Sequence, residues 1–88
     1  MKSIMTNSVT IHTGFPQTIQ YALTETATPD GATEFGVQLK NEATGETAAV
    51  TSLTTDRQRA QQFYHRLIQG AVTPVTLLEV TEDFVADL

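Results

Sequence analysis

The segment Thr54 to Gly70 constrains the fold most, because it is a strongly amphipathic helix that needs an apolar surface to cover. No proline or glycine interrupts the segment before Gly70. Its apolar residues recur at spacings of three and four, which is the period of one helical face. These residues are Ala60, Phe63, Tyr64, Leu67 and Ile68. The other positions from Arg57 to Gln69 are polar, so the sequence predicts a helix with one buried face.

The two ends of this helix are also marked in the sequence. Thr55 and Gln58 have the spacing of a capping box, and Asp56 adds a negative charge where the helix dipole favours one. We expect Gly70 to take the left-handed conformation that often follows the last helical turn. The predicted helix therefore covers residues 55–69.

Three segments before the helix alternate apolar and polar residues, a pattern typical of half-buried strands. They cover residues 17–26, 33–40 and 46–53. Residues 28–31 (Thr-Pro-Asp-Gly) and 41–45 (Asn-Glu-Ala-Thr-Gly) have the composition of turns. Connections this short predict an antiparallel meander of three strands.

The sequence leaves two features of this sheet undecided, namely which face of the third strand is buried and what role Gly36 has. The third strand has small residues on both faces, so either of two alternating sets could be buried. One set is Ala48, Val50 and Ser52, and the other is Thr47, Ala49, Thr51 and Leu53. Gly36 lies inside the second strand, where it indicates a bulge or a close backbone contact such as the crossing helix.

The N-terminal segment, residues 1–16, is predicted to be either flexible or a short strand. Val9 and Ile11 alternate with polar residues over 8–13, which permits a fourth strand there. Residues 17–88 are expected to form a single α+β domain.

The C-terminal segment is predicted to be a second, shorter helix. Thr73 suits an N-cap and Pro74 suits the first helical position. The β-branched residues of 75–80 would also allow a strand, but the spacing of the later apolar residues favours a helix. Its expected stripe is Leu77, Val80, Phe84 and Leu88, with Leu78 and Val85 beside it. The predicted element order is (β)βββαα, with both helices covering the meander.

Composition limits the chemistry that the chain can perform. Of 88 residues, ten are acidic and five are Lys or Arg, for a net charge of −5, and none is cysteine. His12 and His65 have no suitable partner at i+3 or i+4, so we expect no metal and no cofactor. An acidic chain is a poor candidate for binding nucleic acid. No segment resembles a signal peptide or reaches the ~20 apolar residues of a membrane span, so we expect a cytoplasmic protein with no membrane contact.

Charge is segregated along the chain. The main helix segment carries three arginines and one acid, whereas residues 79–88 carry four acids and no base. At helical spacing, one stripe holds Arg59, Gln62, Arg66 and Gln69. We regard this stripe as a candidate surface for docking an acidic protein partner. The structural alternatives are that the stripe is simply solvated or that it pairs with the C-terminal acids.

No catalytic residue set is recognisable, so the sequence favours a small non-catalytic protein-interaction or regulatory module whose partner is unidentified. The alternative is a small-molecule-binding or enzymatic domain with a pocket near His65. A third possibility, nucleic-acid binding, is disfavoured by charge. The sequence does not decide between a monomer and a homodimer.

One order of short motifs is familiar. It comprises Tyr21-Ala22-Leu23, Phe35-Gly36-Val37, Thr54-Thr55-Asp56, the segment V-T-P-V-T-L-L-E-V at 72–80, and Glu82-Asp83-Phe84. This order resembles a small uncharacterised bacterial family, a domain of unknown function found in Gram-positive anaerobes. The resemblance covers Gln17 to the end of the chain, and the V-T-P-V-T-L-L-E-V segment is its most specific part. It implies a compact bacterial protein of one domain and assigns no activity.

Overall fold

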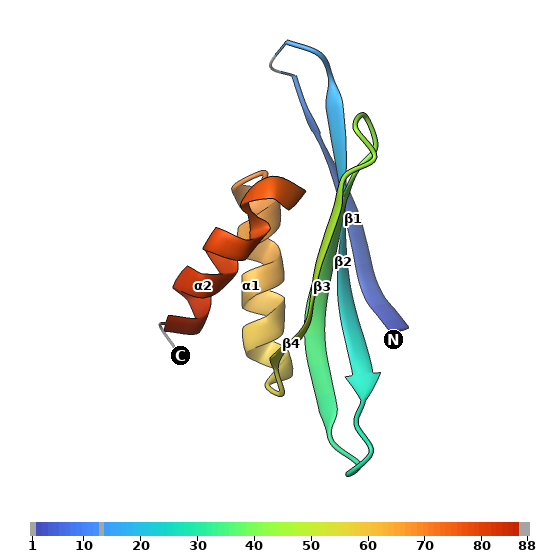
Figure 1. Ribbon diagram of the computed structural model, residues 1–88, viewed down its shortest axis with the longest axis vertical. Coiled ribbons are helices and arrows are strands. Elements are labelled where there is room, and N and C mark those ends of the chain that lie inside the picture. The colour runs from blue at the N-terminus through green and yellow to red at the C-terminus, as the bar shows by residue number, and fades with distance from the viewer. Residues whose placement is uncertain (1, 13, 87–88) are drawn as a thin grey trace.

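The computed structural model describes residues 2–12 and 14–86 and shows one antiparallel sheet with two helices on one of its faces (Figure 1). The fold is the predicted α+β arrangement, and the fourth, N-terminal strand is present. The elements are β1 (Lys2–Ile11), β2 (Gln17–Ala27), β3 (Thr33–Asn41), β4 (Thr47–Thr54), α1 (Arg57–Gln69), the short 3₁₀ helix η1 (Pro74–Thr76) and α2 (Leu77–Ala86).

Each strand pairs with its neighbour in the sequence, in the order β1-β2-β3-β4. The strand β1 begins earlier than the expected range 8–13, of which residue 13 lies outside the described residues. Its pairing with β2 runs from Lys2 opposite Glu25 to Ile11 opposite Gln17. The early half was not predicted because most of its side chains are exposed, so it lacks the alternation that marks a half-buried strand.

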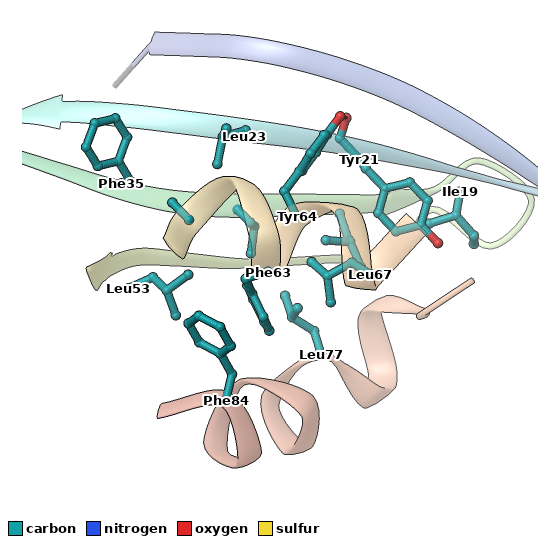
Figure 2. Close-up of a cluster of buried hydrophobic side chains, with 13 residues drawn as sticks. Ile19, Tyr21, Leu23, Phe35, Leu53, Phe63, Tyr64, Leu67, Leu77 and Phe84 are labelled. Carbon is teal, nitrogen blue, oxygen red and sulfur yellow. The ribbon is translucent and has the colours of Figure 1, made fainter. Parts of the chain in front are cut away.

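The core lies between the sheet and the helices (Figure 2). The predicted buried face of α1 is confirmed, with Ile68 only partly buried at its margin. Phe63 packs against Phe84 of α2, with ring centroids 4.6 Å apart, while Tyr64 faces the sheet (Figure 2). The buried side chains are Ile19, Tyr21, Leu23, Phe35, Val37, Leu39, Leu53, Ala60, Phe63, Tyr64, Leu67, Leu77 and Phe84.

The start of α1 lies two residues later than predicted, whereas its last residue, Gln69, agrees with the prediction. The N-cap is Asp56, so the capping box based on Thr55 is wrong and the helix begins at Arg57. Gly70 has φ −86°, and the left-handed residue is Ala71, at φ 48°. The N–H groups of Ala71 and Val72 donate to the carbonyl oxygens of Ile68 and Leu67, at 3.1 and 3.0 Å. These two bonds form a Schellman motif, in which the left-handed residue is Ala71 rather than the preceding Gly70.

The helix α2 is present, which decides against a strand at residues 75–80. Its predicted stripe is confirmed at Leu77 and Phe84, with Val80 partly buried, whereas the flanking residues Leu78 and Val85 are 65% and 48% exposed. Thr81 takes a buried position, and its hydroxyl donates to the carbonyl oxygen of Leu77 at 2.8 Å, so this buried hydroxyl has a hydrogen-bond partner. Leu88 lies outside the described residues. The described stripe consists of Leu77, Thr81 and Phe84, with Val80 partly buried.

The strand β4 changes its buried face part-way along. Ala48 and Val50 pack against the core, whereas Ser52 is exposed and Leu53 is buried. The change coincides with a register shift in the pairing of β4 with β3, which places two extra residues on β4 between Val50 and Thr54. The first predicted set is therefore right at Ala48 and Val50, and the second is right only at Leu53, since Thr51 is exposed.

Gly36 lies at this register shift, between Phe35 and Val37. A Cβ atom on Gly36 would overlap the carbonyl oxygen of Val50 and lie 2.9 Å from the Cα of Thr51. The predicted bulge and close backbone contact are thus both present, but the contacting backbone belongs to β4 rather than to a helix.

Replacing Phe63 by alanine should remove the contact that joins α1 to α2. Phe63 is 0% exposed, so the truncation leaves a cavity in the core. We expect the free energy of unfolding to fall by about 3–5 kcal/mol, measured by urea denaturation. The exposed neighbour Gln62 provides the control, since Gln62→Ala should change stability little. Equal denaturation midpoints for the two variants would show that the assigned helix face is wrong.

Replacing Gly36 by alanine should force β3 and β4 apart. The obstructing atoms are backbone atoms of β4, which cannot rotate away as a side chain can. We expect the free energy of unfolding, measured by urea denaturation, to fall by about 3 kcal/mol, which is the upper end of the usual cost of overpacking. Gly70→Ala is the matched control, because Gly70 has an ordinary helical φ of −86°. A Gly36→Ala protein as stable as the Gly70→Ala protein would contradict this reading of the bulge.

Candidate docking surface

Two tyrosine hydroxyls fix how α1 lies on the sheet. The Tyr64 hydroxyl donates to Oδ1 of Asn7 on β1 at 2.7 Å and lies 3.3 Å from the carbonyl oxygen of Tyr21 on β2. The Tyr21 hydroxyl donates to the carbonyl oxygen of Val72, just after α1, at 2.8 Å. Leaving a buried hydroxyl without a partner costs roughly 1–3 kcal/mol, so these bonds favour a single rotation of the helix.

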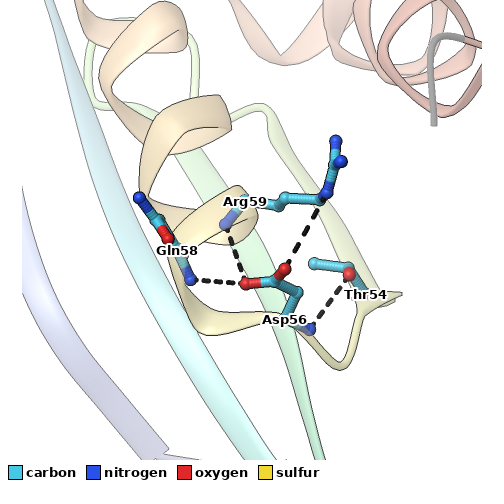
Figure 3. Close-up of polar contacts among 4 residues, drawn as sticks. All are labelled: Thr54, Asp56, Gln58 and Arg59. Atoms are coloured by element: carbon cyan, nitrogen blue, oxygen red, sulfur yellow. Dashed lines mark hydrogen bonds and ion pairs between the residues drawn. The ribbon is translucent and has the colours of Figure 1, made fainter.

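The N-terminal turn of α1 is held by Asp56 (Figure 3). One carboxylate oxygen, Oδ1, accepts hydrogen bonds from the backbone N–H groups of Gln58 and Arg59, at 2.9 and 3.3 Å. The other, Oδ2, lies 3.8 Å from Nε of Arg59, and both side chains are about half exposed. The hydroxyl of Thr54 accepts from the N–H of Asp56 at 3.1 Å. The cap therefore fixes the backbone at Arg59, while the ion pair itself is too exposed to contribute much.

The four residues predicted as a docking surface, Arg59, Gln62, Arg66 and Gln69, are all exposed on α1. We call them the α1 stripe. Among the described residues the structure contains one ion pair, between Arg59 and Asp56. Internal pairing of the stripe with the acids of α2, the structural alternative, is not seen among those residues.

His65, the centre of the alternative functional hypothesis, is exposed on α1. Its ring lies edge-on to that of Tyr64, with centroids 5.7 Å apart. A depression of about 390 Å³ lies elsewhere, and His65 is not among its lining residues. That depression is lined by Thr6, Gln20, Tyr21, Ala22, Gln38, Leu39 and Lys40.

The depression is on the sheet face opposite the helices. Its lining includes Gln20, Ala22 and Gln38, which alternate along their strands with the core residues Tyr21 and Leu39. Sequence reasoning did not identify it, because finding it requires the register that sets β1, β2 and β3 side by side. Its lining contains amides, one lysine and no carboxylate, which is a poor basis for acid–base chemistry.

Residues 2–12 and 14–86 provide neither a cluster of metal ligands nor a membrane-spanning helix. In these ranges, no group of three or more histidine, aspartate or glutamate residues is placed to hold a metal ion. No helix within the same ranges is both long and apolar enough to cross a bilayer. The α1 stripe stays a candidate docking surface, and its four residues are exposed.

The buried tyrosines should make the fold sensitive to alkali. Burial raises the pKa of Tyr64 and of Tyr21 above the ordinary 10.0. The unfolded chain therefore loses these protons at lower pH than the folded chain. Stability is fully present below about pH 10 and is lost as the pH rises through the folded-state pKa values.

Replacing Tyr64 by phenylalanine should weaken this pH dependence. At neutral pH we expect the free energy of unfolding to fall by about 1 kcal/mol, because the hydrogen bond to Asn7 disappears. Between pH 8 and pH 11 the free energy of unfolding should fall less in the variant than in the original protein. Urea denaturation at the two pH values measures both effects. Phe15→Tyr, which adds a tyrosine at a position 87% exposed, should leave the fall unchanged. An undiminished fall in Tyr64→Phe would show that Tyr64 does not cause the alkaline sensitivity.

Comparison with known proteins identifies a family. A family model described as a family of unknown function (DUF6514) matches residues 1–87. The match includes residues 1–16, which the resemblance noted from the motifs left out. No curated protein and no solved structure matches the chain. Because the family match spans nearly the whole sequence, the protein belongs to the DUF6514 family of unknown function.

Proposed function

We propose that this protein is a small non-catalytic interaction module that binds an acidic surface of a protein partner through the α1 stripe. The observation that carries the proposal is the exposure of Arg59 and Arg66, seven residues apart on one helix, in a chain of net charge −5. Among the described residues Arg66 has no ion pair, and Arg59 has only the half-exposed pair with Asp56, so both guanidinium groups are available to an outside anion.

The geometry of α1 suits such a role. The opposite face of the helix is buried, and the hydroxyl of Tyr64 is bonded to β1, so the stripe is presented in one orientation. Guanidinium groups bind carboxylates through two parallel hydrogen bonds, which gives specificity as well as charge attraction. The acidic remainder of the protein repels most anionic proteins at long range and leaves a matched acidic patch able to bind at contact.

Charge reversal at both arginines tests the proposal. In Arg59→Glu/Arg66→Glu, stability should stay within about 1 kcal/mol of the original, because both side chains are exposed. Proteins captured by the original chain from a lysate of its native cells, and identified by mass spectrometry, should be lost. Thermal denaturation establishes that the variant is folded.

A matched control separates the stripe from net charge. Arg57→Glu/Lys40→Glu makes the same change in charge at two other exposed positions, and it should keep the captured partners. Recovery of the same partners by the stripe variant would refute the proposal. Loss of partners from both variants would also refute it, since binding would then depend on net charge alone.

The other expectations from sequence have less support. No observation on the described residues favours a small-molecule or enzymatic role for His65, and an acidic protein with two arginines on the stripe offers little for nucleic acid. We propose a bacterial source and a cytoplasmic location on the grounds of the motif resemblance and of the sequence composition alone.

A further inference from the structure

One long stretch of the sequence has no charged side chain. Residues 3–24 include none of the ten acidic residues and none of the five Lys or Arg residues in the chain. The stretch forms nearly all of β1 and the first part of β2. An uncharged stretch of this length stands out in a protein whose net charge is −5.

The strand β1 is an edge of the sheet, since its only strand neighbour is β2. The other edge, β4, is packed against by η1 and α2. Figure 1 shows β1 on the side of the sheet away from α2. An edge strand presents backbone N–H and C=O groups that have no partner strand.

The register identifies which groups of β1 point outward. The N–H of Glu42 donates to the carbonyl oxygen of Thr18 at 2.9 Å, so the even-numbered residues of β2 bond to β3 and the odd-numbered ones bond to β1. Odd-numbered residues of β1 from Met5 onward lie opposite odd-numbered residues of β2. The N–H and C=O groups of the even-numbered residues of β1 therefore face away from the sheet. These residues are Thr6, Ser8 and Thr10.

Natural edge strands usually carry a device that prevents pairing with another chain, such as a proline, a charge or a bulge. Residues 5–11 of β1 contain neither proline nor charge. The register shift in the pairing of β1 with β2 lies earlier, between Ser3 and Met5. Seven successive residues are thus regular, uncharged and open to a further strand.

The helix-facing side of the same edge is incompletely covered. Met5 and Val9 lie opposite the buried residues Leu23 and Ile19 but are themselves only partly buried. Ile11 and Ile68 of α1 are also partly buried. A strand added beside β1 would remove more of this apolar surface from water, which is favourable.

From these observations we propose that β1 pairs antiparallel with β1 of a second copy of this chain about a twofold axis. The two four-stranded sheets then join into one continuous sheet. A second copy can approach at this edge, because repulsion between two chains of net charge −5 is smallest where both surfaces are uncharged. Pairing of a strand with itself also satisfies the outward groups of both copies at once. This surface is separate from the α1 stripe and does not depend on the proposed function.

Mass and amide exchange together test the pairing. Light scattering after gel filtration should give twice the chain mass of 9.6 kDa. In that dimer the N–H groups of Thr6, Ser8 and Thr10 should exchange with solvent on the order of 100-fold more slowly than in an unstructured chain. A monomer at millimolar concentration would overturn the proposal. A dimer in which these amides exchange freely would overturn it too, because its interface would lie elsewhere.

Substitution at the centre of the edge gives a second test. The N–H of Ser8 faces outward, so Ser8→Pro removes no bond to β2 but blocks a strand from pairing at β1. We expect the folded Ser8→Pro protein to be monomeric and the Ser8→Ala control to remain a dimer. If Ser8→Pro fails to fold, Ser8→Lys replaces it in the test. The two lysines would lie close together near the twofold axis and repel each other, so this variant should also be monomeric. A folded Ser8→Pro or Ser8→Lys protein with the dimer mass would refute the pairing, and Arg59→Glu/Arg66→Glu should keep that mass.

Discussion

One face of the four-stranded meander is apolar and is stabilised by burial, and in this protein the packing of α1 on the sheet buries it. Tyr64 and Phe63 are adjacent in sequence and serve two different contacts. Tyr64 reaches the sheet and β1, while Phe63 meets Phe84 of α2. One helix therefore joins three layers, and its rotation determines both the core and the surface that it leaves exposed.

Much of this arrangement follows from the sequence, because it depends on periodicity. Alternation predicted β2 and β3 closely, and the spacing of Ala60, Phe63, Tyr64 and Leu67 predicted the buried face of α1. Exposure of the α1 stripe follows from the same helical period. Its role in binding does not follow, since neither spacing nor exposure identifies a partner.

The remaining features depended on tertiary geometry. Thr55 and Asp56 are both good N-cap residues, and only the path of the chain selects Asp56. The left-handed residue after α1 is Ala71 because closure by Val72 outweighs the preference of glycine for that conformation. The change of buried face in β4 requires a register shift that alternation within one strand cannot reveal. The early half of β1 has too few buried side chains to be recognised at all.

The linear order of the elements has a consequence for the synthesis of this protein. All four strands precede α1, and each pairs with its neighbour in the sequence, so the complete sheet can form before the covering helix has left the ribosome. At about 5–20 residues per second, the apolar face of the nascent sheet stays uncovered for a second or more. The bond from Tyr64 to Asn7 spans 57 residues and can form only at the end of that interval. The growing chain is thus most exposed to aggregation while the sheet is complete and the helix is not.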